Sequence, residues 1–199
     1  MTSNSKILGL ILAGGRSRRM GGRDKFLLPF GEDTLLDHII SRARPQVEGL
    51  ALSYNGEAEK VAATGLPVVR DTIDDPGPLG GILAGLRAAE GRGFDYLLSF
   101  AGDVPFVPEN YAARLCAALE DGNCLAAVAR SGDRTHPVMG LWPVALADDL
   151  EACLLSGERR VMTWLARHNY EKVVWDEIPD PFMNINTPDD LDRARKLLG

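Results

Sequence analysis

The stretch "KILGLILAGGRSRRMGGRDK", residues 6–25, joins an apolar run to a basic loop rich in glycine. The run at 6–12 has the length and continuous apolar character of a strand buried on both faces, as in a parallel sheet. The loop at 12–25 holds four glycines and five of the 22 lysine and arginine residues. Because glycine has no Cβ, backbone N–H groups of such a loop can approach one anion closely. We therefore expect an anion-binding loop directly after the first strand.

The acidic character of the remaining chain sets this loop apart. The formal net charge is −6, from 28 acidic and 22 basic residues. Residues 1–25 nevertheless contain six basic residues and one acidic residue. A positive loop on an acidic body favours capture of a small anion such as a triphosphate. It argues against general binding to nucleic acid or to an anionic membrane.

Strand-like runs alternate with helical patterns along the chain. Strands are expected at 6–12, 49–55, 67–70, 94–102, 123–130, 136–143, 172–178 and 182–185. Helices are expected at 34–43, 58–65, 79–90, 107–122, 144–155, 159–168 and 187–199. This alternation predicts an α/β fold with a mostly parallel sheet, in one domain over residues 1–199. Such sheets bind ligands in the crevice at the carboxyl ends of their strands.

Two of the expected helices carry a recognisable start. Thr187, Pro188 and Asp190 occupy the N-cap, first and third positions of the last helix, which is the pattern of a capping box with proline in the first turn. Thr34 is a candidate N-cap for the helix at 35–43.

The cysteines and histidines form no metal-binding or disulfide pattern. The three cysteines are odd in number and lack metal-ligand spacing, and the three histidines lie far apart. We expect reduced thiols in a cytoplasmic protein. Neither a signal peptide nor a membrane span is predicted, because the apolar run at 7–12 is too short to cross a bilayer. A monomer is the default expectation.

Two common phosphate-binding loops are absent. The P-loop pattern fails because Lys25 precedes Phe26, and the dinucleotide fingerprint fails because Gly14 and Gly15 are adjacent. The loop resembles instead the signature of nucleotidyltransferases with a Rossmann-like fold. Its form, with Arg19-Met20-Gly21 and Asp24-Lys25, is most similar to the molybdenum cofactor guanylyltransferases, the MobA family. Further stretches that resemble this family are "DPGPLGGILAGL" (75–86), "GDVPF" (102–106), "THPV" (135–138), "GERRVM" (157–162) and "NINTPDDL" (184–191).

The resemblance implies a three-layer α/β/α nucleotidyltransferase fold and a specific reaction. The reaction is transfer of GMP from GTP to the terminal phosphate of molybdopterin or its molybdenum-bound form, with release of pyrophosphate, to give the guanine dinucleotide cofactor. It implies Mg²⁺ as cofactor and transient contacts with cofactor-biosynthesis proteins and molybdoenzyme chaperones. From the acidic net charge we expect no nucleic-acid or membrane partner.

The resemblance also assigns roles to individual residues. Arg19 and Lys25 would hold the β- and γ-phosphates, and Asp103, after a buried strand, would bind Mg²⁺ and complete the catalytic set. The backbone at Leu12, Ala13, Gly14 and Gly15 would cradle ribose and phosphate. Asn55 and Asp71 would bind guanosine, with the carboxylate accepting from the guanine N–H groups. Candidates for the molybdopterin side are Arg159, Arg160, Asn184 and Asn186.

Each of these residues also has a purely structural interpretation. Asp103 could cap the following helix, Asn55 could be a turn residue, and Asp71 could cap a loop. Arg159 and Arg160 could begin a helix on a solvated face. The other loop arginines, Arg16, Arg18 and Arg23, could be merely solvated. We expect His136 to be a packing or hydrogen-bonding histidine.

Two rival functions share much of this pattern. A cytidylyltransferase for the same cofactor, or a nucleotidyltransferase for another phosphorylated acceptor, would share the loop, Lys25 and Asp103. A nucleotide-sensing module without turnover is a different class. The presence of both Lys25 and Asp103 argues against that module, because both residues suit chemistry more than recognition alone.

Overall fold

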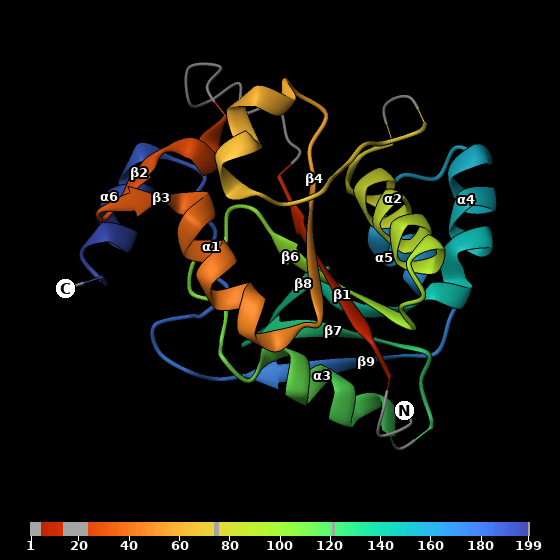
Figure 1. Cartoon of the computed structure of the whole chain (residues 1–199). Coiled ribbons are helices and arrows are strands. Elements are labelled where there is room, and N and C mark those ends of the chain that lie inside the picture. The colour runs from red at the N-terminus through yellow and green to blue at the C-terminus, as the bar shows by residue number, and fades with distance from the viewer. Residues whose placement is uncertain (1–4, 14–23, 74–75, 121, 199) are drawn as a thin grey trace.

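The computed structural model describes residues 5–13, 24–73, 76–120 and 122–198. A seven-stranded sheet with the order β5-β4-β1-β6-β8-β7-β9 runs through the molecule (Figure 1). Its strands are β1 (Ile7–Leu12), β4 (Gly49–Ser53), β5 (Val68–Val69), β6 (Tyr96–Ala101), β7 (Ala126–Ser131), β8 (Arg134–Pro143) and β9 (Tyr170–Trp175). Only β8 runs antiparallel to its neighbours, β6 and β7, which confirms the mostly parallel sheet.

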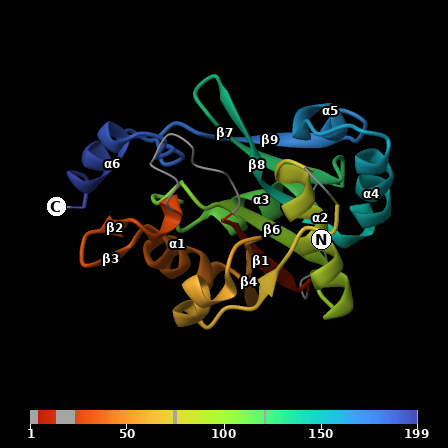
Figure 2. The ribbon, with the colours of Figure 1, turned by 90° about the horizontal axis from the view of Figure 1, so that it is seen from above.

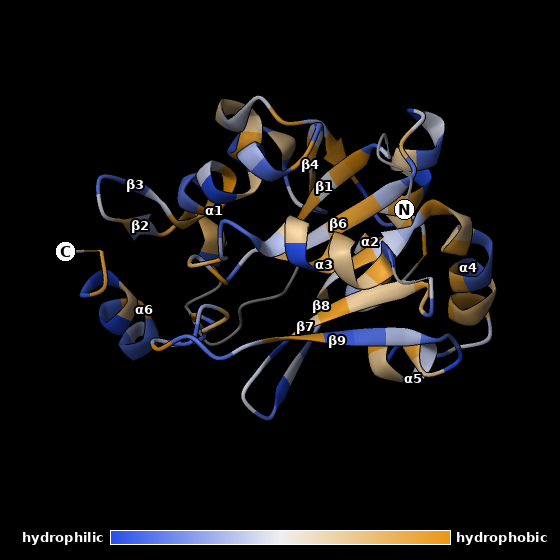
Figure 3. Cartoon of the chain, turned by 90° about the horizontal axis from the view of Figure 1, so that it is seen from below, coloured by the Kyte–Doolittle hydropathy of each residue, from blue (hydrophilic) through white to orange (hydrophobic). Residues whose placement is uncertain are grey.

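Helices cover both faces of the sheet. On one face, Leu8, Leu10 and Leu97 pack against α2 (Pro78–Gly91), α4 (Ala147–Leu155) and α5 (Val161–Leu165). On the other, Ile11 and Phe100 pack against α1 (Leu35–Ala43) and α3 (Tyr111–Glu120). Neighbouring residues of β1 thus point to opposite faces, as strand geometry requires, and both sets are apolar. The three-layer α/β/α architecture follows from these two cores, and Figure 3 shows the apolar central strands.

Short elements complete the chain. A small hairpin, β2 (Pro29–Phe30) with β3 (Asp33–Thr34), precedes α1, and α6 (Pro188–Arg195) ends the chain beside it (Figure 1). The segments Lys25–Leu27, Arg44–Gln46, Ala58–Thr64 and Val144–Leu146 are 3-10 helices. No helix within the described ranges is both long enough and apolar enough to cross a membrane.

The predicted helix starts are confirmed. Thr34 accepts a hydrogen bond from the backbone N–H of Asp37, and Thr187 accepts one from that of Asp190. In both cases the aspartate side chain accepts a hydrogen bond from the backbone N–H of the threonine, which completes a capping box.

The strand expected at 182–185 is wrong. This segment turns after Asp180 and forms no ladder; its Ile185 N–H donates to the backbone oxygen of Asp103 at 2.9 Å. Phe182 and Ile185 are fully buried and fill the core. Their apolar character therefore reflects packing beneath the carboxyl ends of the parallel strands. The same apolar residues led to the incorrect prediction of a strand.

Candidate active site

Lys25 and Asp103 meet at the carboxyl ends of the central strands. Lys25 Nζ lies 2.9 Å from Asp103 Oδ2, although 78 residues separate them in the chain. Both side chains are largely covered, with exposed fractions of 15% and 25%. Charges this sheltered from solvent interact more strongly with each other and with a charged ligand than they would in bulk water.

Two asparagines from the segment after β9 complete this centre. Asn186 Oδ1 accepts a second bond from Lys25 Nζ at 3.0 Å. Asn184 Nδ2 donates to Asp103 Oδ1 at 3.1 Å. The structure thus brings Asn184 and Asn186 together with Lys25 and Asp103.

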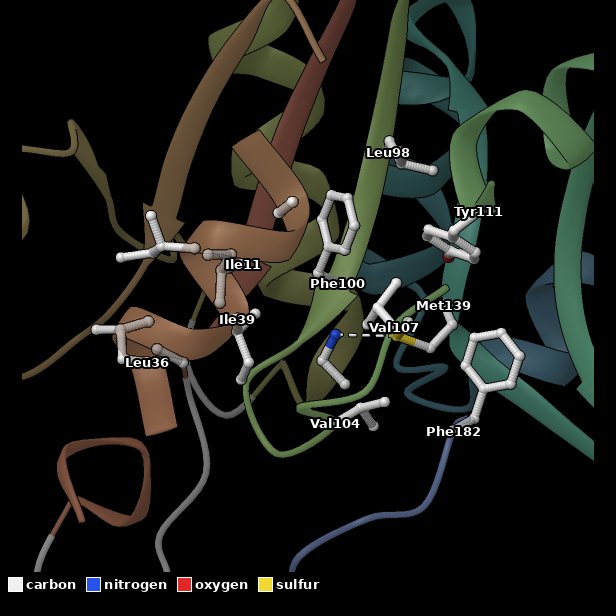
Figure 4. Packing of buried hydrophobic residues seen from close by; sticks show 14 of the residues in the cluster. Ile11, Leu36, Ile39, Leu98, Phe100, Val104, Val107, Tyr111, Met139 and Phe182 are labelled. Atoms are coloured by element: carbon white, nitrogen blue, oxygen red, sulfur yellow. Dashed lines mark hydrogen bonds between the residues drawn. The ribbon is translucent and has the colours of Figure 1, made fainter. Parts of the chain in front are cut away.

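The position of Asp103 is set by its two preceding residues. The Ala101 N–H points to Met139 Sδ at 3.0 Å, and Figure 4 shows this contact within the packed side chains around Phe100. The Gly102 N–H donates to the Leu12 carbonyl at 3.0 Å, so β1 and β6 stay together past the end of β6. A Cβ on Gly102 would lie 2.7 Å from that carbonyl oxygen. Only glycine therefore allows this close approach.

Lys25 is anchored through its neighbour Asp24. The Asp24 carboxylate accepts a hydrogen bond from the Tyr54 hydroxyl at 2.8 Å and lies 3.6 Å from Lys60 Nζ. Burial and the Asp24 carboxylate raise the pKa of Tyr54 to about 12, so the hydroxyl stays protonated and keeps donating. The Tyr54 ring also packs edge-on against Phe26. These contacts fix the short 3-10 helix that presents Lys25.

Asn55 and Asp71 form a second cluster along the same edge, after β4 and β5. Asn55 Nδ2 donates to Asp71 Oδ2 at 2.8 Å, and the Asp71 N–H donates to Asn55 Oδ1 at 2.9 Å. The other carboxylate oxygen, Asp71 Oδ1, is buried without a hydrogen-bond partner among the described residues. Burial raises the pKa of this carboxyl group. A buried acceptor without a partner is unusual in a folded protein, which marks Asp71 as a candidate ligand-binding position.

The start of α2 joins the two clusters. A Cβ on Gly81 would lie 2.7 Å from both Leu12 Cδ2 and Ser53 Oγ, so α2 packs directly on the ends of β1 and β4. A Cβ on Gly80 would lie 3.1 Å from the Asp71 carboxyl carbon. Gly80 and Gly81, from the family-like stretch at 75–86, therefore allow close packing beside Asp71.

Leu12 and Ala13 lie at the floor of this edge. The Leu12 carbonyl accepts from Gly102, and the Ala13 N–H donates to the Ser53 carbonyl at 3.0 Å. Gly14, Gly15 and Arg19 lie outside the described residues, as do Arg16, Arg18 and Arg23. Their predicted phosphate contacts remain predictions.

Arg159 and Arg160 lie beside the start of α2. A Cβ on Gly77 would be 3.6 Å from the Arg159 carbonyl oxygen. Arg159 Nη1 donates to the Leu154 carbonyl at 2.7 Å, which ties it to the end of α4. Arg160 pairs with Glu158, and hydrogen bonds from Arg160 and from both backbone N–H groups lower the pKa of Glu158 to about 2. Their role toward molybdopterin remains a prediction.

His136 has the structural role expected of it. Its Nε2 lies 2.7 Å from Ser131 Oγ, and its ring packs at 4.9 Å from the Phe182 ring. The side chain is buried, and burial lowers its pKa. A neutral histidine in this setting joins the start of β8 to the segment that carries Asn184.

Comparison with known proteins identifies the family. Residues 9–173 match the model of the MobA-like NTP transferase domain. The chain belongs to this family. Among its relatives, the molybdenum cofactor guanylyltransferase of Cereibacter sphaeroides is 49% identical over 193 residues, covering 97% of each chain.

Solved structures agree with this membership. Molybdopterin-guanine dinucleotide biosynthesis protein A from Archaeoglobus fulgidus superposes with a TM-score of 0.79 at 27% identity, covering 96% of this chain and 98% of that one. A Mycobacterium tuberculosis protein solved in complex with manganese has a TM-score of 0.70 at 25% identity, covering 96% of this chain and 99% of that one. The nucleotidyltransferase fold predicted for this MobA-like chain is confirmed.

The donor chemistry at Asp103 fits a hard divalent cation. Mg²⁺ commonly takes one or two carboxylates, with water and substrate phosphates as the other ligands. The Asp103 carboxylate and the Asn184 amide lie together and can both supply oxygen donors. Within the described ranges no group of three or more histidine, cysteine, aspartate or glutamate side chains is placed to hold a metal. One carboxylate and one amide would leave the remaining ligand positions to water or phosphate, and Mg²⁺ at Asp103 remains a prediction.

Two residues of the site were missed by the sequence analysis. Tyr54, directly before Asn55, holds Asp24. Arg134, directly before the family-like "THPV" stretch, donates to Asn184 Oδ1 at 3.0 Å. Proximity to a recognised motif was the available signal in both cases, but the contacts themselves depend on the tertiary fold.

Proposed function

We propose that this protein is a molybdenum cofactor guanylyltransferase. It transfers GMP from GTP to the terminal phosphate of molybdopterin, or its molybdenum-bound form, and releases pyrophosphate. The observation that carries the proposal is the joined group of Lys25, Asp103, Asn184 and Asn186 at the carboxyl edge of β1 and β6. Relatives named for this activity, with identities of 41% to 49% to this chain, support it.

The chemistry requires positioning and charge neutralisation more than proton transfer. The acceptor phosphate oxygen is already ionised, so it attacks the α-phosphorus of GTP without a strong general base. A new P–O bond forms to that phosphorus as its bond to the pyrophosphate oxygen breaks. Negative charge then increases on the leaving pyrophosphate, where cationic groups stabilise it.

Lys25 supplies such a cation from the protein. Its Nζ bonds Asp103 and Asn186 in the described structure, and on binding GTP it exchanges these contacts for β- and γ-phosphate oxygens. The Gly14–Gly15 backbone and Arg19 lie on the same loop and are assigned to the triphosphate as well. Asp103, with Asn184 beside it, would hold Mg²⁺, which when bound neutralises phosphate charge and orients the α-phosphate.

Asp71 and Asn55 would select the base. The Asp71 carboxylate, whose Oδ1 has no hydrogen-bond partner among the described residues, would accept from guanine N1–H and N2–H₂, donors that cytosine does not present together. Arg159, Arg160, Asn184 and Asn186 are assigned to molybdopterin. We further propose a cytoplasmic monomer that receives molybdopterin from a biosynthetic protein and passes the product to molybdoenzyme chaperones, without binding nucleic acid or membrane.

Thermal stability with Mg²⁺ and each of GTP, CTP, ATP and UTP gives the first test. A ligand at 100 times its Kd adds about 2.7 kcal/mol, and we expect this only with GTP. GTP and molybdopterin should then yield pyrophosphate and the dinucleotide. Lys25→Ala and Asp103→Asn should abolish turnover, while the exposed controls Lys172→Ala and Asp192→Asn retain it.

The alternatives predict different results in the same assays. A preference for CTP would assign the cytidylyl reaction. Stabilisation by GTP without turnover on molybdopterin would point to another phosphorylated acceptor or to a sensor. Full turnover by Asp103→Asn would contradict the role given to that carboxylate.

A further inference from the structure

The hairpin formed by β7 and β8 extends past the ligand edge of the sheet. β8 pairs antiparallel with β6 from Pro143, opposite Tyr96, to Gly140, opposite Ser99. The β8 residues before Gly140 therefore continue in the direction in which β6 runs out toward Asp103. Figure 2 shows the hairpin projecting from the sheet, and Figure 3 shows that its tip is hydrophilic. Arg134, the first residue of β8, is thereby carried to the active-site edge.

Arg134 contacts the site from one side of the Asp103 carboxylate. Its Nη2 donates to Asn184 Oδ1 at 3.0 Å, and Asn184 Nδ2 donates to Asp103 Oδ1 at 3.1 Å. Lys25 binds the other oxygen of the same carboxylate, Oδ2. Asp103 therefore stands between two cationic groups, one from the phosphate loop and one from the hairpin.

The hairpin that carries Arg134 is braced. Ser131, which pairs with Arg134 across the hairpin, bonds the buried His136, whose ring packs on Phe182. Arg130 Nε donates to the Gly132 carbonyl at 2.8 Å and so closes the turn. These contacts connect the hairpin to the segment of Asn184, so little ordering is required when a ligand binds.

We propose that Arg134 binds the terminal phosphate of the acceptor and makes the enzyme selective for a phosphorylated acceptor. This inference rests on the proposed function. Attacking and leaving oxygens lie on opposite sides of the α-phosphorus in an in-line displacement. With GTP phosphates on the Lys25 side of Asp103, the acceptor phosphate enters from the Asn184 side, where Arg134 lies.

The chemistry of arginine suits this task. A guanidinium carries five N–H donors in a planar fork, so the bond to Asn184 leaves others for two oxygens of one phosphate. Arg134 is exposed in the described structure and can be reached by a ligand. It neutralises the non-attacking oxygens of the acceptor phosphate and brings the two anions together, and it transfers no proton.

The test compares wild type, Arg134→Ala and Arg167→Ala for binding and turnover of molybdopterin and of its dephosphorylated form. Arg167 is an exposed control that, like Arg134, donates to a side-chain oxygen, here Asp149 Oδ1. We expect Arg134→Ala to weaken binding of the phosphorylated acceptor by about 10- to 100-fold, because charged hydrogen bonds to the phosphate are lost. Binding of Mg²⁺–GTP and of the dephosphorylated acceptor should stay within about twofold of wild type in both variants.

Each other outcome has a definite meaning. If the wild-type protein neither binds nor converts molybdopterin, the proposed function is wrong, and the inference is wrong with it. If the wild-type protein is active and Arg134→Ala binds and converts molybdopterin equally well, only the inference is wrong. An Arg134→Ala protein that loses Mg²⁺–GTP as strongly as the acceptor would show that Arg134 only positions Asp103 through Asn184, which also overturns it. Arg134→Lys keeps the positive charge but lacks the planar guanidinium, so it should bind the acceptor with intermediate affinity. This variant replaces Arg134→Ala in the test if the alanine variant does not fold.

Discussion

Asp71 holds a buried carboxylate oxygen, Oδ1, with no hydrogen-bond donor among the described residues. Without nucleotide, this costs stability, because a buried unsatisfied acceptor is destabilising by about 1–3 kcal/mol. Asp71→Asn removes the charge, while the amide oxygen can still accept from Asn55 Nδ2 as Oδ2 does. The new NH₂ group replaces Oδ1 and remains without a partner. The substitution therefore removes the cost of the buried charge but not the cost of an unsatisfied polar group. We expect the free energy of unfolding to rise by about 1 kcal/mol.

The same change should weaken nucleotide binding. An amide NH₂ facing guanine N–H groups cannot accept from them, so about 1.5–3 kcal/mol of charged hydrogen bonding is lost. The predicted result is a Tm about 2–4 °C higher without ligand and a GTP affinity lowered about 10- to 100-fold. Differential scanning calorimetry and isothermal titration calorimetry measure the two quantities.

The pH dependence gives a third readout with a definite sign. Burial raises the folded-state pKa of Asp71 above its unfolded value of about 3.9. Between these two values the folded state binds the extra proton, so stability declines as pH rises through the folded pKa. Asp71→Asn should lack this decline, whereas the exposed control Asp192→Asn should keep it. A less stable Asp71→Asn protein, or one with unchanged GTP affinity, would refute the reasoning.

Three further predictions concern the supports of the site. Tyr54→Phe removes the hydroxyl bonded to Asp24. It should lower the free energy of unfolding by about 1–2 kcal/mol and weaken GTP binding in a titration. The control Tyr111→Phe loses a buried hydrogen bond away from the site and should lower stability alone. Gly102→Ala places a Cβ 2.7 Å from the Leu12 carbonyl oxygen; urea unfolding should show a loss of about 1–3 kcal/mol, and an unchanged midpoint would contradict the claimed close approach. Thr187→Ala removes the N-cap of α6 and should cost about 1 kcal/mol in the same assay, with Thr187→Ser retaining most of the stability.

Much of the site's outline could be predicted from the order of strands and polar residues. In a parallel sheet the strand ends meet at one edge, so residues directly after β4, β5 and β6 had to gather there. Asn55, Asp71 and Asp103 are such residues, and the structure places each of them at that edge. Capping boxes were predictable because their residues are neighbours in sequence.

The remaining contacts depend on distant parts of the chain. Asn186 reaches Lys25 across 161 residues, and Arg134 reaches Asn184 across 50. Neither contact follows from local periodicity, because the antiparallel course of β8 and the irregular path after β9 determine both. Phe182 and Ile185 suggested a strand because buried coil and buried strand share the same apolar residues.

The meeting of Lys25 with Asn186 has a consequence for the timing of activity during protein synthesis. A growing polypeptide on the ribosome gains Lys25 and Asp103 long before the segment that carries both asparagines is made. Until that segment is added, β1, β4 and β6 can pair, but Lys25 lacks its partner Asn186 and Asp103 lacks Asn184. We therefore expect the site to become competent only after this last segment has been translated. Arrested nascent chains ending at residue 176 should bind Mg²⁺–GTP more weakly than released full-length protein.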